Sequence, residues 1–220
     1  MKPLLICCFT LSFLACHGTI PIGLDASSNE SSDARGALSK AMQSMLAAKS
    51  YRARVESSIS TGTTSTTTIE FVAPDHFHLT REAATPGHAA MKQETIVVGE
   101  ETWMKMGESP WQKFPANFGD VIKQFRDPKV IDQIAKSVDV KLIGTEVLEG
   151  TQTTIYQYTL TGPDNKDFSV NAKTWVAAAD GLPRKTESEG DFNLNGRQIH
   201  SKSIINYYDY EADIKIEKPL

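Results

Sequence analysis

The amino-acid sequence predicts an α+β fold in which helices cover one face of an antiparallel β-sheet. Three observations support this fold class. An amphipathic helical pattern precedes the first strands, strands of alternating apolar and polar residues form two groups, and a second helical stretch separates the groups. Such alternation indicates strands with one buried and one solvated face, which is typical of antiparallel sheets. The helices then supply apolar cover for the buried face.

The first element is a helix that we expect to begin at Ser32 or Asp33, either of which suits the N-cap, and to run to about Lys49. Its apolar residues recur at helical spacing against a polar opposite face. These apolar positions are Ala34, Leu38, Ala41, Met42 and Met45.

The first group of strands begins at Tyr51, where Tyr51, Ala53 and Val55 alternate with charged residues. We expect further strands over 66–74, 76–82 and 92–106, and a short edge strand over 111–114. A turn at Pro74-Asp75 separates two of these strands, and the stretch 92–106 forms a hairpin about Gly99-Glu100.

The stretch 117–137 between the strand groups has helical spacing. Phe118, Val121, Ile122 and Phe125 fit one helical face. Asp127-Pro128 is a suitable start for a second short helix, because proline is favoured at the first helical position. The apolar residues of this second helix are Val130, Ile131 and Ile134.

The second group of strands is expected over 139–150, 153–162, 171–188 and 196–210. Turn residues separate these strands, and the stretch 171–188 contains one such turn itself. They are Gly150, Gly162-Pro163, Gly181 and Asn195-Gly196.

The N-terminal residues have the features of an export signal. Lys2 precedes an apolar run over 4–15, which is shorter than the roughly 20 residues that a membrane-spanning helix needs. The stretch Phe13-Leu14-Ala15-Cys16 resembles the bacterial lipobox, although leucine or another aliphatic residue usually occupies the place of Phe13. We therefore expect cleavage before Cys16 and acylation of this cysteine. An ordinary secretory signal is the alternative.

The chain is then divided into three parts. Residues 1–15 form a lipoprotein signal peptide, 16–32 a flexible tether rich in small and polar residues, and 33–220 one domain. All three cysteines lie within the first 16 residues, so the domain contains no disulfide and no cysteine-based site.

Composition and motifs argue against several functional classes. The formal net charge is −4 and basic residues are not clustered, which argues against nucleic acid as a partner. His76 and His78 alternate on one strand, but a metal site needs a third ligand held close to them. There is no G-x-S-x-G stretch and no phosphate-binding glycine loop. We expect no cofactor, no metal and no catalytic residue.

The order of these elements resembles the LolA-like superfamily, which includes periplasmic lipoprotein carriers and lipoproteins of the LppX and LprG type. The local matches are Trp175-Val176 followed by 180–185 (DGLPRK), the hairpin over 97–104, and the closing segment from Tyr208 to Ile216 and Pro219. The resemblance covers the chain from about Asp33 onward.

The resemblance implies a curved, unclosed half-barrel with helices across its concave face and room for acyl chains between them. The residues that it would place along this cavity are Tyr51, Val55, Phe71 and Trp103 on the strands and Phe118, Val121, Ile122 and Phe125 on the helix. From the residues alone, a filled apolar core is the favoured interpretation of the same side chains, because apolar helix faces usually pack in this way.

We therefore expect an envelope lipoprotein that binds lipid or lipoprotein acyl chains for transport or presentation and is held at the membrane through acylated Cys16. His17 is not the aspartate that retains some lipoproteins in the inner membrane, so we expect the outer membrane. One alternative is a protein-binding envelope sensor on the same fold without a lipid ligand. Another is a structural lipoprotein with no ligand.

Overall fold

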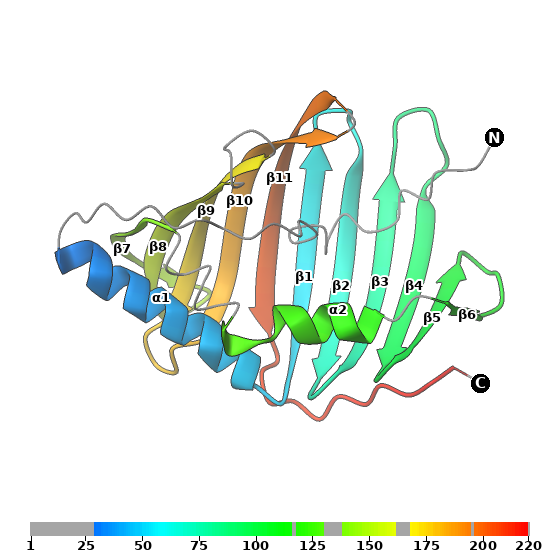
Figure 1. Ribbon diagram of the computed structural model, residues 1–220, viewed down its shortest axis with the longest axis horizontal. Coiled ribbons are helices and arrows are strands. Elements are labelled where there is room, and N and C mark those ends of the chain that lie inside the picture. The colour runs from blue at the N-terminus through cyan, green and yellow to red at the C-terminus, as the bar shows by residue number, and fades with distance from the viewer. Residues whose placement is uncertain (1–28, 116–117, 130–137, 162–167, 195, 220) are drawn as a thin grey trace.

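The computed structural model describes residues 29–115, 118–129, 138–161, 168–194 and 196–219 (Figure 1). The helices are α1 (Asn29–Ala47) and α2 (Phe118–Phe125). The strands are β1 (Ser50–Ile59), β2 (Thr64–Val72), β3 (His76–Ala84), β4 (Met91–Val98), β5 (Glu101–Met106), β6 (Gln112–Phe114), β7 (Val140–Leu148), β8 (Thr151–Thr161), β9 (Phe168–Ala177), β10 (Pro183–Leu194) and β11 (Arg197–Tyr208).

All of these strands join one antiparallel sheet, in the order β6-β5-β4-β3-β2-β1-β11-β10-β9-β8-β7. The first and last strands meet in the middle, where Val55 of β1 pairs with Ile205 of β11. Strands β6 and β7 are the opposite edges, so the chain between them, which contains α2, passes from one edge to the other. The sheet does not close, and the expected α+β fold with a curved, unclosed half-barrel is confirmed.

The two helices lie across one face of this sheet, which we call the inner face (Figure 1). One apolar cluster on this face contains Ala48, Tyr51, Ala53, Phe71, Phe77 and Val97, and Phe118 of α2 packs against it. A second cluster lies where α1 meets β7, and it contains Ala34, Leu38, Val138 and Val140. The opposite face, which we call the outer face, has most of the charged residues of the strands.

Helix α1 forms for the reason that the pattern predicts. Ala34, Leu38 and Ala41 recur on one side, and all three are buried. The helix begins at Asn29, however, before the expected cap at Ser32 or Asp33, so the last part of the expected tether is helical. The apolar periodicity starts only at Ala34, and a polar first turn therefore gives no periodic signal.

Several expected turns are confirmed. The hairpin at Gly99-Glu100 joins β4 to β5, and Gly181, with φ +70°, lies in the turn between β9 and β10. The expected second helix over Val130–Ile134 and the turn at Gly162-Pro163 lie outside the described residues. At the expected helix start, Asp127 Oδ1 accepts a hydrogen bond from the Lys129 N–H at 2.9 Å, as an N-cap residue does.

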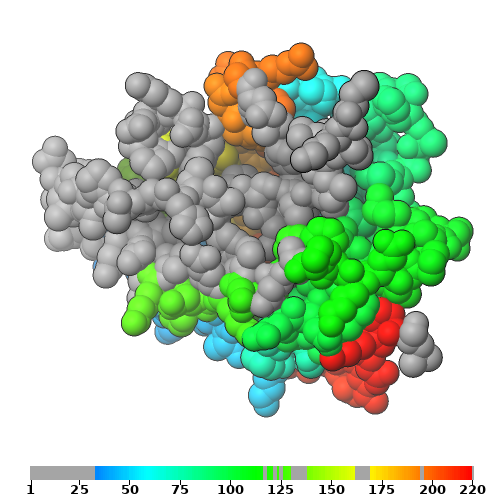
Figure 2. Space-filling model, turned by 45° about the vertical axis from the view of Figure 1, so that its right-hand side comes forward, coloured from blue at the N-terminus to red at the C-terminus, as the bar shows by residue number. Residues whose placement is uncertain are grey.

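The residues after β11 differ from the expectation. Strand β11 ends at Tyr208, and residues 209–219, which we call the C-terminal strap, run along the ends of β1–β5 instead of continuing as a strand (Figure 1). Ser50 Oγ donates to the Ala212 carbonyl at 2.6 Å, and Ile214 of the strap is buried. Near its end, Lys218 forms an ion pair with Glu101 of β5, and Figure 2 shows the red strap against the green segment.

Candidate functional site

The inner face has an aromatic cluster where β1, β2, β3 and β11 lie side by side. The ring centroids of Tyr51 and Phe71 are 5.0 Å apart, and those of Phe71 and Phe77 are 4.8 Å apart. Tyr207 and Tyr210 extend the cluster, with centroids 6.5 and 5.8 Å from that of Tyr51. Burial raises the pKa of both Tyr207 and Tyr210 above its ordinary value, so their hydroxyls stay protonated at neutral pH. The tyrosines therefore add no charge to the aromatic cluster.

Helix α2 is fixed on this cluster from both ends. At its start, the Phe118 ring stacks on Phe114 of β6, with centroids 5.5 Å apart. Further along, Lys123 Nζ lies 3.5 Å from the carboxylate of Asp75, which lies in the turn between β2 and β3. These contacts hold α2 across the inner face near the ends of the strands.

Arg126, which follows α2, joins both helices to the sheet. Its guanidinium lies 3.8 Å from the centroid of the Phe71 ring, and its Nη2 donates to the Leu46 carbonyl at 2.5 Å. Leu46 lies in the last turn of α1, where a cation is favourable because the carbonyls there are unpaired. Burial lowers the pKa of Arg126, and the Tyr51 hydroxyl partly offsets this. No motif in the sequence indicates this contact.

The structure brings together four of the residues that were expected to line a cavity. Tyr51, Val55 and Phe71 are buried on the inner face, and Phe118 packs on the cluster that contains Tyr51 and Phe71. Val121, Ile122 and Phe125 belong to α2, but their side chains lie outside the described part of the structure. That these residues bind a ligand stays a prediction.

Trp103 was expected to point inward, and this placement is wrong. Its neighbour Thr102 is fully buried and pairs with Val97 on the inner face, so the alternation of β5 places Trp103 on the outer face. There, Lys113 Nζ and Lys218 Nζ lie 5.9 and 5.4 Å from the Trp103 ring. Trp103 therefore helps to hold the C-terminal strap and does not line the inner face.

Away from the aromatic cluster, hydroxyl groups line part of the inner face, and several of them bond to one another across neighbouring strands. The Oγ atoms of Ser57 and Ser65 are 2.8 Å apart across β1 and β2, and those of Ser188 and Ser203 are 2.8 Å apart across β10 and β11. Hydroxyls paired in this way need no water, so they can lie against apolar atoms at low cost. The serines and threonines of β2 are the sequence signal for this surface.

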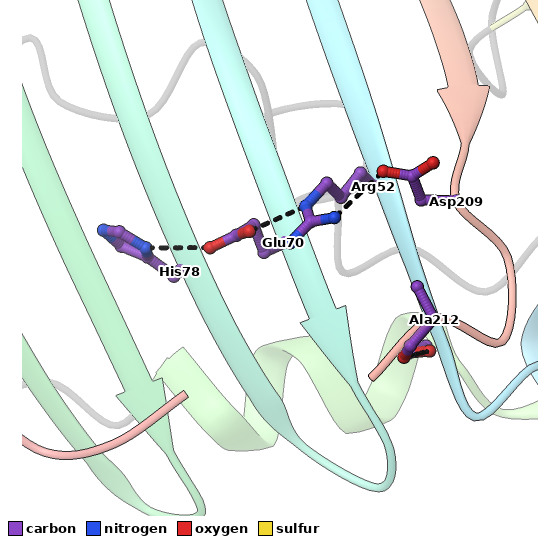
Figure 3. A network of polar contacts seen from close by, with 6 residues as sticks. Arg52, Glu70, His78, Asp209 and Ala212 are labelled. Atoms are coloured by element: carbon purple, nitrogen blue, oxygen red, sulfur yellow. Dashed lines mark hydrogen bonds and ion pairs between the residues drawn. The ribbon is translucent and has the colours of Figure 1, made fainter. Parts of the chain in front are cut away.

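The outer face has a network of charges across five strands and the strap, and Figure 3 shows the part of it on β1, β2, β3 and the strap. Arg52 donates to Glu70 at 2.8 Å and to Asp209 at 2.9 Å, and His78 Nδ1 lies 3.2 Å from Glu70. Desolvation acts to raise the Glu70 pKa, but hydrogen bonds from Arg52 and His78 outweigh it, and the pKa is lowered. His78 Nε2 in turn lies 3.8 Å from Glu94, which pairs with Lys105 of β5.

This network stabilises the sheet and has no feature of a metal centre. No group of three or more histidine, cysteine or acidic side chains is placed to hold a metal among the residues that the structure describes.

Two open depressions of about 620 and 360 Å³ lie along β11, and Lys202, Ser203 and Ile204 line both of them. Lys202 and Ile204 point to the outer face, away from the aromatic cluster.

Known proteins resemble this chain in fold but not in sequence. No protein-family model and no curated protein matches the sequence. The lipoprotein LppX of Mycobacterium tuberculosis matches with a TM-score of 0.59 and 13% identity, over 86% of this chain and 100% of LppX. A LolA superfamily protein of Nitrosomonas europaea matches with a TM-score of 0.25 and 15% identity, over 83% of this chain and 94% of that one.

The MucA/MucB complex of Pseudomonas aeruginosa also matches, with a TM-score of 0.40 and 17% identity, over 82% of this chain and 59% of that one. Among the described residues, no helix is both long and apolar enough to cross a membrane. Of the three structures, LppX has the highest TM-score and is matched over its whole length. The chain therefore has the fold of LppX, and this confirms the fold that the resemblance to lipoproteins of the LppX type implies.

Proposed function

We propose that this chain is a lipoprotein of the bacterial envelope that binds an acyl chain of a lipid or lipoprotein on the inner face of its sheet. The observation that carries this proposal is the composition of the inner face across β1–β5. Its side chains are apolar or uncharged, apart from Arg81. The fold shared with LppX, described as a lipoprotein, supports the same role. The role is one of binding and not of catalysis.

Burial of methylene groups would drive binding. Each methylene group removed from water contributes about 0.8 kcal/mol, so about ten buried groups of a fatty acyl chain contribute about 8 kcal/mol before the entropic cost of association. Tyr51, Val55 and Phe71 would supply the apolar wall. Helix α2, held by Phe118 and Arg126, would cover the chain and would have to move for its release.

Acylation at Cys16 would hold the protein at the membrane, and this favours a stationary acceptor or presenter over a shuttle. A single acyl chain gives only reversible binding to a membrane, so stable anchoring needs more than one chain. With His17 next to the cysteine, we assign the protein to the outer membrane. Residues 1–15 would be removed as the signal peptide.

The test is lipid co-purification with the full chain from bacterial envelopes. Purified protein is washed in mild detergent, and the lipids that remain are extracted and quantified by mass spectrometry. We expect close to one lipid per chain for the wild type and much less for Val55→Trp, which fills the inner face. Glu56→Trp, on the outer face of the same strand, is the matched control and should retain the lipid. Equal lipid content in all three proteins would contradict the proposal.

The second candidate is a protein-binding regulator, and the edge strand β7 is the observation that favours it. Leu142, Ile143 and Val147 are 60%, 45% and 62% exposed on β7, which is an edge strand of the sheet that the described residues form. Free edges with apolar side chains are sites of strand pairing with a partner. If this is the function, Leu142→Lys with Val147→Lys abolishes capture of an envelope protein by cross-linking in cells, while Val55→Trp leaves it unchanged.

A further inference from the structure

Arg81 is the one charged residue on the inner face of strands β1–β5, all of which the structure describes. Its position follows from the pairing, because Arg81 lies opposite Thr67 of β2 and Gln93 of β4 and shares the parity of Phe77 and Leu79. The pattern could have been found in the sequence. In HFHLTRE, the positions of Phe77 and Leu79 continue to an arginine where a third apolar residue would be expected.

Two buried polar atoms of this site, one on each strand, lack hydrogen-bond partners. Arg81 Nε is buried and has no hydrogen-bond partner, and the same holds for Thr67 Oγ1 on the opposite strand, in a residue that is 1% exposed. By contrast, Arg52 and Arg54 on the outer face both pair with carboxylates. Among the described residues, the other buried side-chain atoms without a hydrogen-bond partner are His78 Nε2, which lies 3.8 Å from Glu94, and Thr102 Oγ1. A buried polar atom without a partner costs about 1–3 kcal/mol, and more when it is charged.

Two unpaired groups on neighbouring strands would be satisfied by one oxyanion. The guanidinium donates N–H groups and the threonine hydroxyl donates its O–H, and both donors suit a phosphate oxygen. The described inner-face positions of β1–β5 contain no carboxylate that could serve instead. Thr102 Oγ1 is also unpaired, but it lies away from Arg81. Its strand partner is Val97, which is four residues along β4 from Gln93, the partner of Arg81, so no cation of the strands lies beside Thr102.

The same strands continue into apolar surface. From Arg81 toward the aromatic cluster, β3 presents Leu79 and then Phe77, which lies four residues away or about 13 Å along the strand. In the other direction the inner face opens at Met91 and Met106, which are both 42% exposed. A ligand with an anionic head and an apolar tail would therefore meet its charge partner first and its apolar partners beyond it.

We propose that Arg81 and Thr67 bind a phosphate group, carried by a lipid headgroup or free, on the inner face of the sheet. For the lipid, this rests on the proposed function, and it names the class of ligand as an anionic phospholipid. The phosphate satisfies the guanidinium and the hydroxyl, while its acyl chain lies along Leu79 toward Phe77. A neutral lipid of equal chain length leaves both donors unpaired and binds more weakly.

The test offers the full chain, in detergent, an equimolar mixture of phosphatidylglycerol and diacylglycerol with the same acyl chains. The protein is immobilised and washed, and the retained lipids are quantified, with the amount retained by Val55→Trp as background. We expect the wild type to retain about tenfold more phosphatidylglycerol than diacylglycerol, as a charge-assisted hydrogen bond implies. Arg81→Gln should bring this ratio close to one while diacylglycerol retention is unchanged.

Control variants separate the site from folding and from net charge. Arg54→Gln removes an arginine from the outer face of β1 and should keep the wild-type ratio, whereas Thr67→Val should lower it. Arg81→Lys keeps the charge and should retain part of the preference. The Tm of each variant is compared with that of the wild type, so that an unfolded variant is recognised and left out. The lipid ratios of the folded variants then test the role of Arg81 and Thr67.

The outcomes distinguish this proposal from the proposed function. A wild-type ratio near one with both lipids retained overturns the headgroup site and leaves acyl-chain binding intact. Retention of neither lipid above background overturns the proposed function. In that case, inorganic phosphate that raises the Tm of the wild type but not of Arg81→Gln assigns the site to free phosphate. If inorganic phosphate does not change the Tm of the wild type and the two lipids are not retained differently, the phosphate site is overturned altogether.

Discussion

Removal of the Arg126 side chain should loosen α2 and the end of α1 without unfolding the sheet. The guanidinium lies 3.8 Å from the Phe71 ring centroid and donates to the Leu46 carbonyl at 2.5 Å. A hydrogen bond from a charged donor contributes about 1.5–3 kcal/mol, and a cation–π contact about 0.5–2 kcal/mol. Burial of the charge offsets part of this gain. We therefore expect Arg126→Ala to destabilise the closed arrangement by about 1–3 kcal/mol.

Hydrogen exchange followed by mass spectrometry measures this local change. A loss of 1–3 kcal/mol corresponds to roughly 5- to 150-fold faster exchange, and we expect it in peptides over 118–129 and 40–49. Peptides from β9 and β10 should be unaffected. Arg54→Ala, an exposed arginine on the outer face, is the matched control. Unchanged exchange in α2, or equal acceleration in every strand, would refute the role of Arg126.

Three further predictions concern stability and anchoring. Gly190→Ala should lower the free energy of unfolding, measured in urea, by about 1–3 kcal/mol, because the new Cβ would lie 2.3 Å from the Ser169 carbonyl oxygen. Gly36→Ala should raise it by about 0.5–1 kcal/mol, because no atom lies near this position on α1. A Gly190→Ala protein more stable than the Gly36→Ala protein would contradict this packing. Glu70 has a lowered pKa, so its contribution is present above its unfolded pKa and lost as the pH falls through the lower folded value. The stability difference between wild type and Glu70→Gln should therefore shrink as the pH falls below the ordinary glutamate pKa of 4.5 and vanish once the pH is below the lower folded value, and a constant difference would count against the network. Cys16→Ser should abolish incorporation of labelled palmitate, and continued labelling would exclude this cysteine as the acylation site.

The alternation of apolar and polar residues was sufficient to predict the strands and their inward side chains in the first group. Tyr51, Val55 and Phe71 are on the inner face because every second residue of a strand points the same way. The same rule applied within β5 would have placed Trp103 outside, since it shares its side of the strand with Lys105, while Met104 and Met106 share the other side. A tryptophan is apolar enough to suggest burial, but on the outer face the ammonium groups of Lys113 and Lys218 lie over the ring of Trp103.

Long-range pairing was beyond the sequence pattern. No local signal shows that β1 pairs with β11, which puts Val55 beside a residue 150 positions later, Ile205. The contact of Arg126 with Leu46 and Phe71 depends on the same topology, because the segment with α2 has to cross the sheet. Arg81, by contrast, was visible in the alternation of β3, and it shows that an interruption of an apolar face is itself a signal.

The most direct test of acyl-chain binding is a cross-linking map in living cells. Bacteria that express the full chain are fed a photoreactive fatty acid, irradiated, and the modified peptides of the protein are identified by mass spectrometry. We predict light-dependent cross-links in peptides of β1–β3 that contain Val55, Phe71 and Phe77, and light-independent label at Cys16. Light-dependent cross-links confined to outer-face residues, or absent from β1–β3 while Cys16 is labelled, would contradict binding on the inner face.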